Sequence, residues 1–406
     1  MPYPQKALSE IERVLKNDSI LIAPTFIHDE GFGFYLRICL MELIGFHIFY
    51  KWNSLKKSFS SFRTCCHWWK FNTIMLFDCT KGKRNMKILV YGAGVLGCEL
   101  SHILLKSIHE ITLFARGKWK ENIDKNGLII RHYVQCHTTK ERINTIDFLS
   151  HDDHYDLIFI PMQCSQLDDV ISILAANCSQ KIIFIGNNGQ ALETERKLQS
   201  YSAIPKEIAF AFQTTGGRRE NGKVISIYMN RVLTIGGSQN ALSKDFQEML
   251  KNAFKNTSCQ LEWENQMDAW LKCHLAFILP ICYVCYSVDG HLSKATRDQR
   301  KALLDAVNEG YQVLKALHIP ILPQGDDLYF QDSKKRKMME AMIFVMMKTP
   351  IGRLAASDHA MHAVIEMKML DSQFEVLCQR SHVNMPNWIL LKNQMKSWYE
   401  LEKQGK

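Results

Sequence analysis

The sequence lacks the features that are typical of repeat proteins, secreted proteins and membrane proteins. It contains no internal repeat, no low-complexity tract and no cleavable secretory signal. The apolar stretch at residues 31–50 is interrupted by Arg37 and Glu42, and charges are costly at the centre of a bilayer. These absences argue against a repeat protein, a secreted protein and a membrane anchor.

Composition narrows the classes further. The chain has 406 residues, of which 47% are hydrophobic and 22% are charged, as expected for a soluble protein of two domains with a large core. Its 13 cysteines are odd in number and scattered. That pattern favours a reducing, cytoplasmic environment over a disulfide framework.

The net charge of +9 does not indicate a nucleic-acid partner. Residues 1–85 hold 12 basic and 7 acidic residues, which leaves only +4 for the other 321 residues. No basic face with interleaved aromatic residues is visible there, so we expect no nucleic acid to bind. Residues 1–85 do not resemble the rest of the sequence. We expect a poorly ordered extension, with upstream sequence foreign to the native protein as the alternative.

The most informative segment is residues 86–97, MKILVYGAGVLG. A short apolar run, typical of a buried parallel strand, leads into G-x-G-x-x-G and then into helical spacing. In that context Gly92 permits a tight turn, Gly94 lets a pyrophosphate approach the backbone, and Gly97 lets the helix pack on the strand. The predicted dinucleotide-binding residues are Gly92, Ala93, Gly94, Val95, Leu96 and Gly97.

The end of the next predicted strand selects the cofactor. Arg116 follows residues 110–115, at the position where an NAD site usually has an acidic residue, about 20 residues past the glycines. A guanidinium suits a 2′-phosphate, which a carboxylate would repel. We therefore expect NADPH, against the alternative that Arg116, Lys118 and Lys120 form a solvated basic turn.

Apolar runs and helical segments alternate beyond this point. Residues 156–161 and 181–186 predict further parallel strands, and residues 208–237 predict a strand meander that finishes the domain. Long amphipathic segments follow. The expected fold is α/β, with a Rossmann-type doubly wound parallel sheet at residues 86–263 and an all-α domain at residues 264–406.

This alternation also predicts where a ligand binds. In a doubly wound parallel sheet, ligands bind in the crevice at the carboxyl ends of the strands. The loops expected to share that rim are residues 92–97, 116–120, 162–166 and 186–190.

Several short motifs follow one another in a characteristic order. They are ITLFARG at 111–117 with NGL at 126–128, NNG at 187–189, WLK at 270–272, and Asp358 followed by Glu366. Together, from residue 86 to the C-terminus, they resemble the ketopantoate reductase (2-dehydropantoate 2-reductase) family. The resemblance implies reduction of a 2-keto acid, a small-molecule substrate, with hydride from NADPH and a proton from Lys272.

The resemblance also implies roles for individual residues. Lys272, in an apolar run, would supply positive charge and a proton to the developing alkoxide. Asn188 would orient the cofactor or the carbonyl group. Glu366 would be the second catalytic residue and position the substrate, and Asp358 would help bind it. The plain alternatives are a surface lysine, an Asn-Gly turn and an exposed helix carboxylate.

Some positions depart from the family where its members usually contact substrate or cofactor. Ala276 and Pro280 stand where asparagines are common, and Leu354 stands where serine is usual. The loop that often carries a cofactor-side lysine reads Met162-Gln163. Fewer polar partners favour a substrate less polar than ketopantoate. They also favour the alternative of a non-catalytic NADPH-binding sensor that has lost its substrate groups.

Two patterns have the spacing of metal ligands but little support. Cys282-x-x-Cys285 lacks a second Cys or His pair at zinc-site distance, and His359, His362 and Glu366 lack the H-E-x-x-H arrangement. We therefore predict no metal site. A homodimer formed through the helical domain is left open as an alternative.

Overall fold

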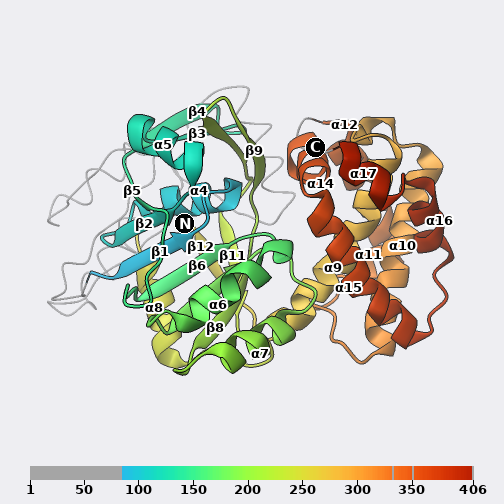
Figure 1. Cartoon of the computed structure of the whole chain (residues 1–406). Helices are drawn as coiled ribbons and strands as arrows, with labels where there is room; N and C mark the ends of the chain where they lie inside the picture. The colour runs from blue at the N-terminus through green and yellow to red at the C-terminus, as the bar shows by residue number, and fades with distance from the viewer. Residues whose placement is uncertain (1–84, 332, 350–351, 405–406) are drawn as a thin grey trace, which may run out of the picture. The chain divides into compact units, whose positions relative to one another are not determined.

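The computed structural model describes residues 85–331, 333–349 and 352–404, and Asn85–Lys406 form one compact unit (Figure 1). The predicted extension lies outside the described residues, except for Asn85. The division of the compact unit into two domains stays a prediction. The expected boundary falls between a short strand, β12 (Gln260–Trp263), and a long helix, α9 (Met267–Ser287).

An eight-stranded sheet forms the centre of the first part, in the order β12-β11-β8-β7-β6-β1-β2-β5. Neighbouring strands pair in parallel except β8 and β11, which are antiparallel. Its other strands are β1 (Lys87–Tyr91), β2 (Glu110–Phe114), β5 (Asn144–Ile146), β6 (Leu157–Pro161), β7 (Lys181–Ile185), β8 (Glu207–Gln213) and β11 (Val232–Gly236).

Helices cover both faces of this sheet, as a doubly wound fold requires. Ile88 and Val90 of β1 pack in one core with α4 (Val95–Leu104) and α8 (Lys244–Ala253). Leu89 and Tyr91, which point to the opposite face, pack in a second core with α6 (Asp168–Ala176) and α7 (Ala191–Tyr201). This alternation explains the unbroken apolar runs, because every strand residue meets a covered face. The predicted Rossmann-type sheet is confirmed.

A second sheet of four strands was not predicted. Its order is β4-β3-β10-β9, formed by β3 (Leu128–His132), β4 (His137–Glu141), β9 (Gly216–Glu220) and β10 (Lys223–Ile227). The predicted meander at residues 208–237 is therefore wrong in part, because only β8 and β11 join the main sheet. The sequence of β9, GGRRE, has no apolar side chain to bury there.

Helix α4 lies between the two sheets. Its Leu100 and Ile103 pack toward the main sheet, whereas Cys98 packs against Leu128 and Ile130 of the smaller one. All residues of α4 from Gly97 onward are buried. The smaller sheet thus encloses the helix that follows the glycine-rich loop.

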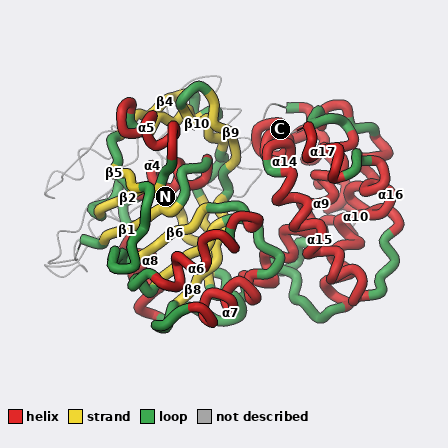
Figure 2. The backbone as a smooth tube through the Cα atoms, in the orientation of Figure 1, coloured by secondary structure: helices red, strands yellow, loops and turns green. Residues whose placement is uncertain are grey.

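Among the described residues, no strand follows β12. Figure 2 shows helices and loops around α9, α10 and α15. Helix α9 is long and apolar enough to cross a membrane, but 72% of its most apolar window is buried within the protein, as in a core helix. The predicted helical region is confirmed. It comprises α9, α10 (Arg297–Ala316), α11 (Leu328–Gln331), α12 (Ser333–Lys348), α14 (Asp358–His362), α15 (Val364–Ser381), α16 (Pro386–Gln394) and α17 (Trp398–Gln404).

Candidate active site

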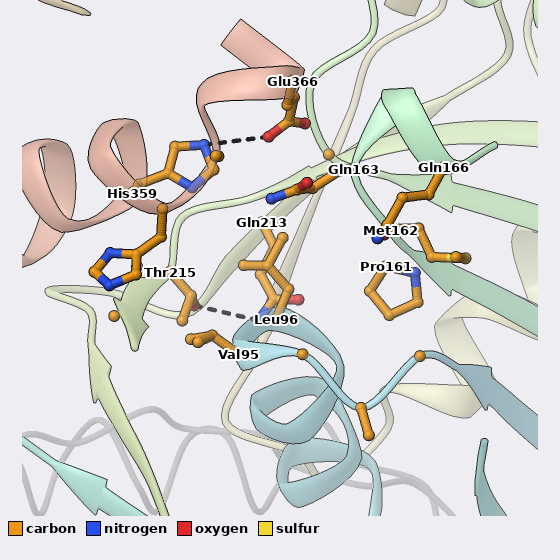
Figure 3. Close-up of a pocket in the computed structure, with 18 of the residues that line it drawn as sticks. Val95, Leu96, Pro161, Met162, Gln163, Gln166, Gln213, Thr215, His359 and Glu366 are labelled. Carbon is orange, nitrogen blue, oxygen red and sulfur yellow. Dashed lines mark hydrogen bonds and ion pairs between the residues drawn. The ribbon is translucent and has the colours of Figure 1, made fainter. Parts of the chain in front are cut away.

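A cavity of about 880 Å³ opens at the carboxyl ends of the parallel strands. Residues from all four predicted rim loops line it, so the expected rim is confirmed. Strand β9 and helices α9, α14 and α15 complete the wall. Figure 3 shows Val95 and Leu96 on one side of the space, and His359 and Glu366 on the opposite side. The volume lies within the range of about 300–1,000 Å³ that is usual for small-molecule sites.

The glycine-rich loop has the geometry of an anion cradle. Gly92 has a φ of +146°, which favours glycine, and a Cβ on Gly94 would meet nothing within 4 Å. Gly94 is also the residue before the first turn of α4, where backbone N–H groups lack partners within the helix. Gly97 has a different role and does not line the cavity, because its Cβ would lie 1.8 Å from the Gly92 carbonyl oxygen.

Arg116 lies at the cavity, as expected for the residue after β2. It is exposed and precedes the first turn of α5 (Gly117–Asn126), with its guanidinium 6.0 Å from the Phe114 ring. Trp119 of α5 also lines the cavity, and the Arg219 guanidinium of β9 lies 5.4 Å from the Trp119 ring. Two cations and an aromatic ring are therefore available for the nucleotide end of a cofactor.

The structure brings Asn187 to the cavity and turns Asn188 away from it. The Asn188 amide donates to Thr194 Oγ1 (2.9 Å), and its carbonyl accepts from the Gln190 backbone N–H (2.8 Å). Asn188 therefore supports the start of α7, and its predicted binding role stays a prediction. Asn187 Oδ1 is buried without a hydrogen-bond partner among the described residues. The orienting amide that the sequence placed at Asn188 is thus available one residue earlier.

Lys272 does not line the cavity. Its ammonium group forms an ion pair with Asp268, one turn earlier on α9, and Asp268 also accepts from the Leu192 backbone N–H. The side chains that α9 directs to the cavity are His274 and Ile278. The catalytic role of Lys272 stays a prediction, which the described geometry does not favour.

The two late acidic residues both reach the cavity, in different environments. Asp358 Oδ2 accepts from Arg218 Nη1 at 2.8 Å, so its charge is already paired. Glu366 is 2% exposed, and its Oε2 has no hydrogen-bond partner among the described residues. Burial raises the pKa of Glu366 to about 8. Asp358 is therefore held as an ion pair, whereas Glu366 is a neutral acid at pH 7.

The comparisons with known proteins agree with this geometry. Residues 88–240 match the family model described as Ketopantoate reductase PanE/ApbA. The match covers less than half of the chain, so it shows that residues 88–240 are similar to this family. No curated protein matches the sequence.

Solved structures share the fold of this chain beyond the matched residues. They include a D-mandelate dehydrogenase with NADH and anilino(oxo)acetate (14% identity, TM-score 0.60) and a 2-dehydropantoate 2-reductase from Geobacter metallireducens GS-15 (16%, 0.60). A dimeric ketopantoate reductase from Staphylococcus aureus is a third (12%, 0.56). Each comparison covers 79% of this chain and 99–100% of the other. At these identities the likeness shows the fold alone.

The departures from the ketopantoate reductase pattern do not shape the cavity as expected. Ala276, Pro280 and Leu354 are buried, and none of them lines it. Ala276 instead faces Gly310 of α10, where an added Cβ would lie 3.0 Å from its own. Their apolar character therefore reflects packing within the helical region. It does not measure the polarity of the substrate pocket.

Sequence reasoning missed the side chains that form the cavity wall. The His274 ring stacks on Trp270, with 5.5 Å between ring centres, and lies tilted against Phe212, with 4.2 Å between ring centres. Burial, with the nearby His359, lowers the pKa of His274 to about 4. Gln213 also lines the cavity, with its Oε1 buried and unpartnered among the described residues. The signal in the sequence is the four-residue spacing of Trp270 and His274, which places both side chains on the same face of the helix, the face toward the cavity.

The spacings considered for metal ligands lead to no metal site in the described part of the chain. No group of three or more His, Cys, Asp or Glu side chains there could hold a metal ion. Cys282 and Cys285 are buried in the core of the helical region. His359 does approach Glu366, with 3.6 Å between Nε2 and Oε2.

Proposed function

We propose that this chain is an NADPH-dependent reductase that converts a 2-keto acid to the 2-hydroxy acid. The observation that carries the proposal is one cavity with an open glycine cradle and three buried acceptor oxygens without partners among the described residues. Those oxygens are Asn187 Oδ1, Gln213 Oε1 and Glu366 Oε2. Unpaired buried acceptors are costly, so they fit a ligand that brings N–H and O–H donors, such as a carboxamide or a hydroxyl group.

The residues present fit a nicotinamide dinucleotide. The Gly92–Gly94 backbone and the first turn of α4 would hold the pyrophosphate, and Asn187 would accept from the carboxamide. When bound, the reduced cofactor supplies a hydride. Arg116, with Arg219 near it in the lining, would pair with a 2′-phosphate. The carboxylates that line the cavity, among described residues, are Asp358 and Glu366, and neither follows β2, so NADPH is preferred to NADH.

The wall near the helical region favours a keto acid with a ring or a branched apolar chain. Phe212, Ile278 and Met162 line the cavity together with the neutral His274 ring. One protein that shares the fold is a D-mandelate dehydrogenase, solved with NADH and anilino(oxo)acetate, an aromatic ligand. The direction of this preference agrees with the sequence expectation, although it rests on different residues.

A substrate panel tests the proposal on the full chain. We expect NADPH to be oxidised faster with phenyl-substituted 2-keto acids than with ketopantoate, and NADPH to bind more tightly than NADH. Arg116→Ala should reduce that cofactor preference by about 10-fold or more, the usual value of a charge-assisted hydrogen bond. Lys118→Ala is the matched control, because Lys118 is exposed and does not line the cavity. Tighter binding of NADH would contradict the cofactor assignment.

Lys272→Ala tests the predicted proton donor directly. If Lys272 supplies the proton, turnover is lost while NADPH affinity is retained; a near-normal rate would exclude that role. A non-catalytic NADPH sensor remains the second candidate, because Lys272 lies outside the cavity lining. Tight NADPH binding without turnover on any keto acid would favour the sensor. Cytoplasmic localisation and a homodimer stay predictions.

A further inference from the structure

We propose that Glu366 and His359 form a proton-transfer pair, in which Glu366 protonates the substrate oxygen and His359 returns a proton to Glu366. This inference rests on the proposed reductase function. It assigns the acid step to residues that line the cavity, in place of Lys272.

A break between two helices brings the pair together. Helix α14 ends at His362 and α15 begins at Val364, with Ala363 between them at φ −121° and ψ +33°, outside the helical region. His359 and Glu366 are seven residues apart, and their side chains approach to 3.6 Å across this break. Figure 3 shows both side chains directed at the same space above Val95 and Leu96. The pair therefore faces the start of α4, where the cofactor would lie.

Glu366 has the surroundings of a stored acid. Its side chain is buried, Oε2 accepts no hydrogen bond from a described residue, and burial raises its pKa to about 8. Burial outweighs the backbone hydrogen bond from Cys164, which favours the carboxylate form. The titratable groups that face the pair are Cys164, His274, Cys282, Tyr286 and His362.

His359 has the exposure that Glu366 lacks. Its side chain is 41% exposed, whereas that of Glu366 is 2% exposed. This exposure is toward the cavity that His359 lines, and the protein around the cavity still desolvates the ring. That desolvation, with the nearby His362, lowers the pKa of His359, so the resting imidazole is neutral at pH 7. A carboxylate formed at Glu366 would attract a proton to the imidazole from solvent. His359 thus links the buried acid to water.

The step balances as follows. The keto carbon accepts the hydride of the reduced nicotinamide, the carbonyl π bond breaks, and the oxygen takes the proton of the Glu366 carboxyl group. The products are the hydroxy acid, the oxidised cofactor and a Glu366 carboxylate. His359 then takes a proton from solvent on its other ring nitrogen, and the imidazolium so formed passes the Nε2 proton to the Glu366 carboxylate and returns to the neutral ring. Asp358 is less suited to this step, because its Oδ2 already accepts a hydrogen bond from Arg218 Nη1 at 2.8 Å.

Glu366→Gln is the decisive variant, because the amide keeps the shape and cannot give up a proton. We expect kcat to fall by about 100-fold or more, with NADPH affinity unchanged within about 2-fold. Glu375→Gln is the matched control; it lies on the same helix, is 41% exposed and pairs with Lys392. His359→Asn should lower kcat less and shift the pH profile, because Glu366 then exchanges its proton more slowly. A Glu366→Gln enzyme with normal kcat would overturn the inference.

A second readout does not depend on activity. Folded Glu366 keeps its proton up to about pH 8, whereas the unfolded side chain loses it near 4.5. Between these values only the folded state is protonated, so this group makes wild type lose stability as pH rises. The Tm of Glu366→Gln, relative to wild type, should therefore rise from pH 5 to pH 8. A constant difference overturns the stored acid, whereas wild type without turnover on any keto acid overturns the proposed function itself.

Discussion

A single methyl group at Gly97 tests how the glycine-rich loop is built. An added Cβ would lie 1.8 Å from the Gly92 carbonyl oxygen and 3.0 Å from Pro161 Cγ. To reach the ordinary contact distance of 3.4 Å, α4 and the loop must separate by about 1.6 Å. Helix α4 cannot retreat freely, because Cys98 packs against the smaller sheet on its other side. We therefore expect Gly97→Ala to cost about 3 kcal/mol, at the upper end of ordinary overpacking.

Gly94→Ala is the matched control. Gly94 is only three residues from Gly97 in the sequence, but it lies in open space. Gly94 has a φ of −73°, which alanine adopts easily, and an added Cβ meets no atom within 4 Å. The methyl group would instead enter the space through which the pyrophosphate approaches. We expect Gly94→Ala to fold normally and to bind NADPH at least about 10-fold more weakly.

Thermal unfolding and cofactor titration separate the two effects. At roughly 2 °C per kcal/mol for a large domain, Gly97→Ala should lower Tm by about 6 °C. Gly94→Ala should leave Tm unchanged and lose the stabilisation that added NADPH gives to wild type. An unchanged Tm in Gly97→Ala would refute the packing described for α4. Wild-type NADPH affinity in Gly94→Ala would refute the placement of the cofactor.

Two further predictions concern polar groups buried beside α4. Arg231→Ala should cost about 3–5 kcal/mol in urea unfolding, because Glu99, which is 0% exposed, loses guanidinium hydrogen bonds of 2.9 and 2.7 Å. The control variant Lys255→Ala, at an exposed position, should change the free energy of unfolding little. Burial, with a smaller contribution from His102, lowers the pKa of His132 to about 3, so below pH 6.5 the unfolded state binds a proton that the folded state does not. Between pH 7 and pH 5 the free energy of unfolding of wild type should therefore fall by about 2 kcal/mol more than that of His132→Asn. An equal fall in both proteins would contradict this prediction.

The main sheet was predictable because its signals are local. The five residues of β6 are all buried, so the strand had to be an unbroken apolar run, and the same holds for most of β1 and β7. The smaller sheet carries no such signal. Strands β4 and β9 are polar and half-exposed, and β9 joins β3 only through β10, more than 90 residues later in the chain. Pairing over that distance cannot be seen in a local pattern.

The loops that form the candidate site could be predicted from the sequence, but the individual side chains that line it could not. The rule that ligands bind at strand ends gave the correct rim, but the choice between Asn187 and Asn188 depends on which amide begins α7. On α9, Lys272 and His274 are two positions apart, so they point about 200° apart around the helix. A motif fixes the sequence position of a helix, whereas packing fixes the direction in which each of its faces points.

The enclosure of α4 has a consequence for how this protein admits its ligands. Helix α4 packs against a β-sheet on each side, and its Glu99 forms an ion pair with Arg231. These contacts leave the helix no room to tilt or slide. Its N-terminus is therefore a rigid, preformed site, and a nucleotide can bind there with almost no rearrangement of the helix. Any opening and closing that accompanies turnover must then come from the opposite wall, where the short helix α14 meets the long helix α15 at Ala363.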